Sequence, residues 1–205
     1  MDQAAGSRRA VRHPGPEPMI QAGTIGTERL TLLPLRVEHA EEMVVVLSDP
    51  ALHTFIGGTP ATGAELRARY ERQTAGSPDP RVSWCNWVIE TDGGRLVGTV
   101  QATVTESEPE PEPEPGPESE PKPETEPADG AGPVAEIAWV VGTPWQGRGI
   151  ATEAVRALVD RLGAEGVRSY VAHIHPDHAA SAAVAAAAGL APTDERHEGE
   201  IRWRR

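Results

Sequence analysis

The sequence predicts one α/β domain with a central mixed sheet and flanking helices. Two observations lead to this prediction. Apolar runs of strand length alternate along the chain with segments whose apolar residues recur at helical spacing. The length of 205 residues suits one domain, or one domain with extensions, and is enough to bury a sizeable core.

The first half of the domain is expected to begin with a strand and two helices. Leucines at positions 30, 32 and 35 mark the strand. Apolar residues at positions 40, 43, 44 and 47 lie on one face of a helix predicted over residues 37–47. Thr62 and Glu65 have the spacing of a capping box and predict a second helix that ends near Thr74.

A hairpin and a run of strands and helices complete the predicted domain. The turn Asp92-Gly93-Gly94 separates two predicted strands, residues 84–90 and 95–105. Further on, residues 134–141 and 167–174 are predicted strands, and residues 150–162 and 179–188 are predicted helices. Residues 195–203 are predicted to form a closing pair of strands.

Two stretches differ in composition from the rest of the expected domain, residues 24–205. Residues 1–23 are rich in Gly, Pro and Ala and are predicted to be a disordered leader, so that Met19 is a candidate for the true start. The insertion over residues 105–133 has nine Glu, one Asp and one Lys, which is −9 of the net charge of −12. Its Glu-Pro repeat favours a solvated, partly polyproline-II segment. This insertion is either merely tolerated or an acidic arm that recruits a basic partner.

Composition also bounds the class of protein. A single cysteine, Cys85, excludes an internal disulfide and fits a reducing, cytoplasmic location. No apolar run approaches the roughly 20 residues that span a bilayer, so no membrane anchor is expected. The chain outside the insertion has a net charge of only −3. It has no continuous run of basic residues, which argues against nucleic-acid binding. The assembly state, monomer or homodimer, is left open.

A glycine-bearing turn is the most informative local feature. The stretch from Gln146 to Ala151 follows a predicted strand and opens a predicted helix. The first turn of a helix has backbone N–H groups without internal partners, and the helix dipole adds positive charge there. Gly147 and Gly149 have no Cβ, so a phosphate or pyrophosphate can approach the main chain closely. The turn therefore predicts a site for a nucleotide-like cofactor tail.

This turn resembles the acyl-coenzyme A signature of the GNAT superfamily of N-acetyltransferases, R/Q-x-x-G-x-G/A, with Gln146, Gly149 and Ala151 at its defined positions. The sequences around it, residues 27–35 and 135–141, resemble the branch related to ribosomal-protein N-acetyltransferases. The resemblance covers roughly residues 24–205, with the acidic insertion as one interruption. It implies a GNAT-like fold in which residues 134–141 splay from a parallel neighbour, residues 167–174.

The same resemblance implies acetyl-CoA as cosubstrate, bound in that splayed gap. The pantetheine arm has two amides, which an unpaired strand edge can bond as if they belonged to an added strand. The expected partners of this arm are Trp139, Val140 and Val141. The residues expected to hold the pyrophosphate are Gln146, Gly147, Arg148, Gly149, Ile150, Ala151 and Thr152.

Two residues are candidates for catalysis. Glu136 is the candidate general base, since a carboxylate in an apolar strand is costly unless it faces a cavity or a partner. The alternative is a Glu136 that faces solvent or pairs with an arginine. Many family members have Asn-x-x-Ser and, seven residues after the Asn, a tyrosine that protonates the thiolate. These positions hold His178, Ser181 and Ala185 here, so the tyrosine is missing. By resemblance Ser181 serves the thiolate, and His178 is expected beside the pantetheine arm.

The sequence thus predicts an N-acetyltransferase that moves an acetyl group from acetyl-CoA to a primary amine of a protein N-terminus or a small molecule. Acceptor loops are expected around residues 55–62 and 84–87. One alternative is a non-catalytic acyl-CoA-binding module with an acidic interaction tether. Another is a metal-dependent hydrolase built on His173, His175 and His178, although their spacing fixes no further ligand and no metal is predicted. Cys85 has no base spaced beside it and is expected to be a strand cysteine rather than a nucleophile.

Overall fold

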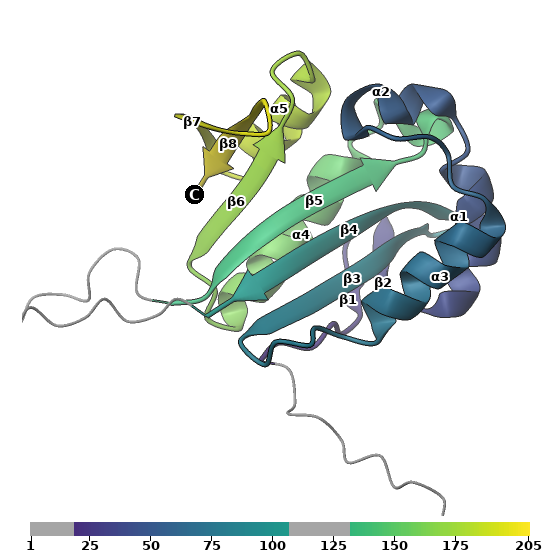
Figure 1. Cartoon of the computed structure of the whole chain (residues 1–205), viewed down its shortest axis with the longest axis horizontal. Helices are drawn as coiled ribbons and strands as arrows, with labels where there is room; N and C mark the ends of the chain where they lie inside the picture. The colour runs from purple at the N-terminus through teal and green to yellow at the C-terminus, as the bar shows by residue number, and fades with distance from the viewer. Residues whose placement is uncertain (1–18, 107–131) are drawn as a thin grey trace, which may run out of the picture.

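The structure, a computed structural model, describes residues 19–106 and 132–205 (Figure 1). Residues 1–18 of the predicted leader and 107–131 of the predicted insertion lie outside the described residues. The last residues assigned to the leader pack against the sheet. Ile20 is buried, and Trp87 Nε1 donates a 2.7 Å hydrogen bond to the Gly23 carbonyl. The packed domain therefore includes residues 19–23 as well, because an apolar side chain and a buried indole N–H both find their partners there.

The centre of the molecule is one sheet in the order β1-β2-β3-β4-β5-β6-β8-β7. Its strands are β1 Ile25–Gly26, β2 Leu30–Pro34, β3 Val82–Thr91, β4 Leu96–Thr105, β5 Val134–Val141, β6 Ser169–Ile174, β7 Ala191–His197 and β8 Glu200–Arg204. Among the described residues only β5 and β6 pair in parallel; the other neighbours are antiparallel. The predicted mixed sheet is confirmed.

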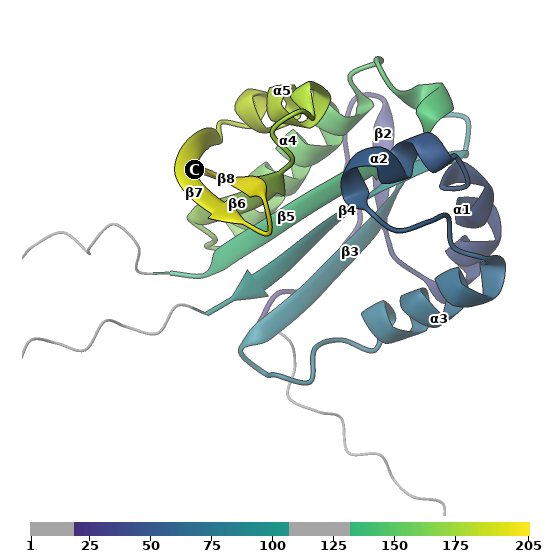
Figure 2. The same ribbon diagram turned by 45° about the horizontal axis from the view of Figure 1, so that its top comes forward.

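Helices cover both faces of this sheet. They are α1 Ala40–Val46, α2 His53–Ile56, α3 Gly63–Thr74, α4 Ile150–Ala164 and α5 Ala179–Ala187, with single 3-10 turns at Val37–His39, Pro50–Leu52 and Thr143–Trp145. Figure 2 shows α4 and α5 on one side of the sheet and α1 to α3 on the other. The predicted capping box at α3 is present, since Glu65 N–H donates to Thr62 Oγ1 and Thr62 N–H donates to the Glu65 carboxylate.

Two apolar clusters hold the layers together. The larger cluster lies between α4 and the sheet, and the smaller one lies beneath α1 and α3. On β5 the side chains alternate accordingly: Ala135, Ile137 and Val141 are buried in the larger cluster, whereas Glu136 and Ala138 lie exposed on the opposite face. This alternation leaves the face of β5 away from α4 open at the start of the strand.

The sequence missed two short elements and predicted two others with different bounds. Strand β1 has two residues and α2 has four, so neither is long enough to show a periodic apolar pattern. The helix predicted over residues 37–47 is divided, because a 3-10 turn precedes α1. Strand β7 begins earlier than predicted, at Ala191, and its Pro192 is tolerated because β7 forms the edge of the sheet.

Candidate cofactor and acceptor site

The most informative feature of the sheet is a fork between β5 and β6. Their parallel pairing covers only Val134 to Glu136 against Ser169 to Val171. Beyond this point β5 stays paired with β4 as far as Val141, and β6 stays paired with β8, but the two strands diverge (Figure 1). The edge of β5 that faces β6 therefore has no strand partner beyond Glu136 within the described residues, and its peptide groups are available to a ligand.

The turn after β5 has the conformation that its two glycines allow. Gly147 and Gly149 have φ of 73° and 76°, in the left-handed region that residues with a Cβ rarely adopt. The Gln146 side chain closes the turn, because its Nε2 donates a 2.9 Å hydrogen bond to the Val141 carbonyl. The signature glutamine thus ties the turn to the end of β5, a role that its sequence position alone does not reveal.

The turn delivers the chain into α4 with an uncapped N-terminus. Gly149 is the N-cap residue and has no side chain with which to cap this end of the helix. The first hydrogen bond of the helix runs from Glu153 N–H to the Gly149 carbonyl, so the N–H groups of Ile150, Ala151 and Thr152 precede it. Together with the dipole of this 15-residue helix, these donors form a site for an anionic group.

A network of hydrogen bonds fixes this helix start to the beginning of the sheet. The Glu153 carboxylate accepts from Thr27 Oγ1 at 2.6 Å and from Arg29 N–H and Nε at 3.0 and 2.8 Å. Arg29 also donates to the Arg148 carbonyl at 3.2 Å. Burial alone would raise the pKa of Glu153, but the hydrogen bonds from Thr27 and Arg29 outweigh it and lower that pKa. The network therefore holds a charged glutamate in the first turn.

A cavity of about 400 Å³, called here the cofactor cavity, lies along the fork and the turn. It brings together eleven of the residues that the sequence selected: Trp139, Val140, Val141, Gln146, Gly147, Gly149, Ile150, Ala151, Thr152, His178 and Ser181. Arg148 and Glu136 do not line it. The Arg148 side chain is exposed, and the part of Arg148 engaged in the structure is its carbonyl.

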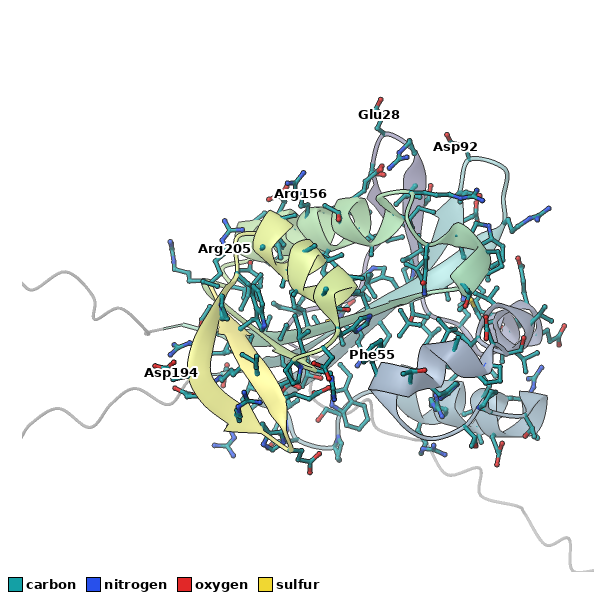
Figure 3. The ribbon with its side chains drawn as sticks, turned by 90° about the horizontal axis from the view of Figure 1, so that it is seen from above. Glu28, Phe55, Asp92, Arg156, Asp194 and Arg205 are labelled. Atoms are coloured by element: carbon teal, nitrogen blue, oxygen red, sulfur yellow. The ribbon has the colours of Figure 1, made fainter. Side chains whose placement is uncertain are left out.

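The start of α5 closes one end of the cofactor cavity. His178, the N-cap residue of α5, stacks on Phe55 of α2 with ring centroids 4.2 Å apart and planes 8° apart. Figure 3 shows Phe55 between the C-terminal strands and the N-terminal helices. Burial lowers the pKa of His178 and the neighbouring His175 lowers it further, so the ring is neutral near pH 7. The sequence placed an acceptor loop at residues 55–62 but gave no signal for this contact.

Glu136 stands at the fork itself. It belongs to the last parallel pair, opposite Val171, and 62% of its side chain is exposed. Its Oε1 lies 3.4 Å from His173 Nδ1, and the His173 ring lies 5.3 Å from that of His197. Four residues of strand, about 13 Å, separate Glu136 from Val140. Glu136 therefore faces a separate, shallow hollow next to the fork, where water has access to it.

A second cavity, called here the Tyr70 cavity, adjoins the first on the side of α1 and α3. It has about 140 Å³ and shares Leu52 and Val140 with the cofactor cavity. The Tyr70 hydroxyl is buried and has no hydrogen-bond partner among the described residues. Burial raises the pKa of Tyr70 to about 12, so this hydroxyl is a neutral donor at all ordinary pH values. Nothing in the sequence singles out this hydroxyl, because a tyrosine on the apolar face of a helix is expected to be an ordinary core residue.

The remaining candidates have separate surroundings. His173 contacts Glu136, whereas His175 and His178 lie around Phe55, and no group of three metal-ligating side chains occurs within residues 19–106 and 132–205. Cys85 is fully buried, and burial raises the pKa of its thiol to about 11. It is a strand cysteine, as expected. None of the helices described is both long enough and apolar enough to cross a membrane.

Comparison with known proteins identifies a family. The family model described as acetyltransferase (GNAT) domain matches residues 29–191. The curated proteins give no match. Among solved structures, the chain is similar to RimL, a ribosomal L7/L12 alpha-N-protein acetyltransferase in complex with coenzyme A, with 17% identity, a TM-score of 0.63 and coverage of 89% of this chain and 97% of that one.

Two further solved structures are similar to a comparable extent. The microcin C7 self-immunity acetyltransferase MccE, in complex with acetyl-CoA and AMP, has 15% identity and a TM-score of 0.60, with coverage of 87% of this chain and 93% of that one. An acetyltransferase from Agrobacterium tumefaciens has 22% identity and a TM-score of 0.59, with coverage of 97% and 99%. At these identities the structural likeness establishes the fold.

Proposed function

Because the chain belongs to the GNAT acetyltransferase family, we propose that it transfers an acetyl group from acetyl-CoA to a primary amine in a ternary complex. The observation that carries this proposal is the fork between β5 and β6, which opens beside an uncapped helix N-terminus. A fork exposes peptide groups for an amide-containing arm, and the helix start supplies donors for a pyrophosphate. The two features lie on one cavity.

Acetyl-CoA fits this arrangement in one direction only. Its pyrophosphate would bind the N–H groups of Ile150, Ala151 and Thr152. Its pantetheine arm would run along β5 and bond the free backbone edge at Trp139 to Val141. The thioester then lies further toward the fork, on the side of Glu136. Solved relatives support this cosubstrate, since RimL and MccE were crystallised with coenzyme A and acetyl-CoA.

The reaction that we propose is direct acyl transfer. The neutral amine nitrogen attacks the thioester carbonyl carbon, a C–N bond forms, the C–S bond breaks, and coenzyme A leaves as a thiolate. The amine loses one proton and the thiolate takes up one. Glu136 is the proposed base and acts through water, because its side chain lies open to solvent at the fork. Its neighbour His173 lies 3.4 Å from the carboxylate through Nδ1 and positions it at the fork.

The thiolate side of the site has one polar side chain in the position that the family pattern indicates. Ser181 lines the cofactor cavity, whereas Ala185, at the position of the family tyrosine, is buried in the apolar cluster. We assign the thiolate-side hydrogen bond to Ser181. A thiol has an ordinary pKa near 8.5, so the thiolate also leaves readily without a strong acid. The acceptor, a protein N-terminus or a small-molecule amine, binds from the face opposite α4.

The test is a titration followed by an assay. Calorimetry with acetyl-CoA and free coenzyme A is expected to show micromolar binding, about −8 kcal/mol. Release of coenzyme A with a panel of amines then measures transfer. Glu136→Gln is expected to lower turnover and leave cofactor affinity nearly unchanged. Ser181→Ala is expected to lower turnover by a smaller factor than Glu136→Gln does. Binding without any amine-dependent release would instead support a non-catalytic acyl-CoA-binding module with an acidic interaction tether, and equal turnover in Glu136→Gln would remove Glu136 from the role of base.

A further inference from the structure

The face of the sheet opposite α4 forms an ordered polar surface next to the fork. The pairing registers of β3, β4 and β5 place its side chains in two adjacent rows: Trp84, Thr103 and Glu136, and beside them Asn86, Gln101 and Ala138. Neighbouring strands are about 4.8 Å apart, so each row spans roughly 10 Å from β5 to β3. The second row ends in a single methyl group at β5, which leaves room beside the fork.

Charged side chains stand at both ends of this surface. At the β5 end the Glu136 carboxylate lies in a hollow that it shares with Arg196 and with the ion pair of Arg202 and Glu195. At the β3 end, Arg69 and Arg72 of α3 line a hollow of about 290 Å³ together with Trp84 and neutral side chains. Arg69 and Arg72 lie on the same side of α3, because they are three residues apart, and neither forms an ion pair with any residue in the described parts of the chain. Among residues 19–106 and 132–205, no carboxylate lines this hollow.

The hollow continues into the Tyr70 cavity. The two share Arg69, Gln73, Asn86 and Gln101, and the Tyr70 cavity in turn meets the cofactor cavity at Val140. Tyr70 is 3% exposed and its hydroxyl has no partner in residues 19–106 and 132–205. A buried hydroxyl without a partner costs free energy, so a polar atom of a ligand or water in this cavity would be bound by it. This is a second, independent indication that a ligand occupies this side of the sheet.

Trp84 adds a recognition surface of another kind. It is 40% exposed, one of two large apolar side chains exposed to this extent among the described residues. An indole ring beside two guanidinium groups offers a flat apolar contact next to positive charge. A polycationic acceptor would meet like charge at this end, whereas an anionic group would find two guanidinium donors that form no ion pair within the described part of the chain.

We propose that the acceptor is an amine with a carboxylate about 10 Å from its amino nitrogen, as in an extended peptide N-terminus whose third residue is acidic. This inference rests on the proposed acetyl transfer and specifies its acceptor. The amine lies at the fork beside Glu136, and the carboxylate lies between Arg69 and Arg72. Two residues of extended chain span about 7 Å, and a carboxylate side chain covers the remaining distance.

The experiment is a comparison of two peptides that differ only in charge. Binding of Ala-Ala-Glu amide and Ala-Ala-Gln amide is measured by calorimetry on the full chain in the presence of free coenzyme A. The Glu peptide is expected to bind about fivefold to tenfold more tightly, the latter worth 1.4 kcal/mol, and the preference is expected to shrink as salt is added. The double variant Arg69→Gln, Arg72→Gln is expected to bind both peptides equally.

Arg67→Gln is the matched control. Arg67 lies on the same helix, but it pairs with Glu41 at 3.0 Å and does not line the hollow, so this variant is expected to keep the preference. Equal binding of the two peptides to the wild type, binding of neither, or a preference that survives in the double variant would each overturn the proposal. If the Glu peptide is preferred but releases no coenzyme A from acetyl-CoA, the anionic recognition stands and the proposed transfer fails.

Discussion

Gly98 of β4 gives the sharpest test of how the cofactor strand is held. A Cβ built on this buried glycine would lie 2.3 Å from the Val140 carbonyl oxygen and 3.0 Å from Val141 Cα. Ordinary contacts begin at 3.4 Å, so Gly98→Ala requires β5 to move by about 1.1 Å at that oxygen. Backbone cannot yield as a flexible side chain would. Overpacking of this kind costs about 1–3 kcal/mol, a sizeable part of the 5–15 kcal/mol that stabilises a typical domain.

The same displacement acts on the proposed cofactor site, because Val140 and Val141 line the cofactor cavity. Gly98→Ala is therefore expected to lower the urea midpoint and also to weaken coenzyme A binding measured on the folded protein. Gly93→Ala is the control: nothing lies within 4 Å of its Cβ position, and it is expected to change stability by less than about 1 kcal/mol. If Gly98→Ala has the same urea midpoint and the same coenzyme A affinity as the wild type, the close approach of β4 and β5 does not constrain the residue at position 98.

Three further predictions concern single side chains. Glu153→Gln should cost about 1–2 kcal/mol at pH 7, measured from urea midpoints. Because the pKa of Glu153 is lowered in the folded protein, its contribution is present above the ordinary value of about 4.3 and is lost as the pH falls through the folded value. The urea midpoints of the two proteins should therefore converge as the pH falls, and a difference that does not change with pH would exclude the charge as its cause. Tyr70→Phe should leave the free energy of unfolding unchanged or raise it by up to about 1 kcal/mol. If urea denaturation shows a markedly lower free energy of unfolding for this variant, the hydroxyl has a hydrogen-bond partner in the protein. Cys85 should resist a thiol reagent at pH 8 until the protein unfolds, since burial raises its pKa to about 11; mass spectrometry that finds rapid labelling of the native protein would contradict this.

Features that depend on local sequence could be predicted. The capping box at Thr62 and Glu65 determines the start of α3 through contacts three residues apart. The turn from Gln146 to Thr152 could be predicted for the same reason, because glycines with positive φ and a helix start are encoded within a few residues. The residues of this turn, apart from Arg148, line the cofactor cavity and make up most of the proposed cofactor contacts.

Features that depend on distant parts of the chain could not be predicted from the residues themselves. The fork was expected only from family resemblance, because strand register depends on how whole strands pack. The bond between Arg29 and Glu153 joins residues 124 apart in sequence, and the stacking of His178 on Phe55 joins α5 to a helix of one turn. The Tyr70 hydroxyl, Arg69 and Arg72 became informative only when the cavities that they line were known.

The short pairing between β5 and β6 has a consequence for how the molecule opens. In the described parts of the chain, β5 and β6 pair through only three residues each, and this is the only pairing in the sheet between β1 to β5 and the strands β6, β8 and β7. The C-terminal part can therefore separate locally at a lower free energy than the whole sheet can unfold. Amide hydrogens of β6 that do not bond β8 should then exchange faster than those of β3 and β4. A ligand that forms hydrogen bonds with the free edge of β5 and also contacts α5 joins the two parts of the sheet. These parts can then separate only after the ligand has dissociated. Saturation at 100 times the dissociation constant would raise the free energy of opening by about 2.7 kcal/mol and bring the two regions toward one cooperative unit.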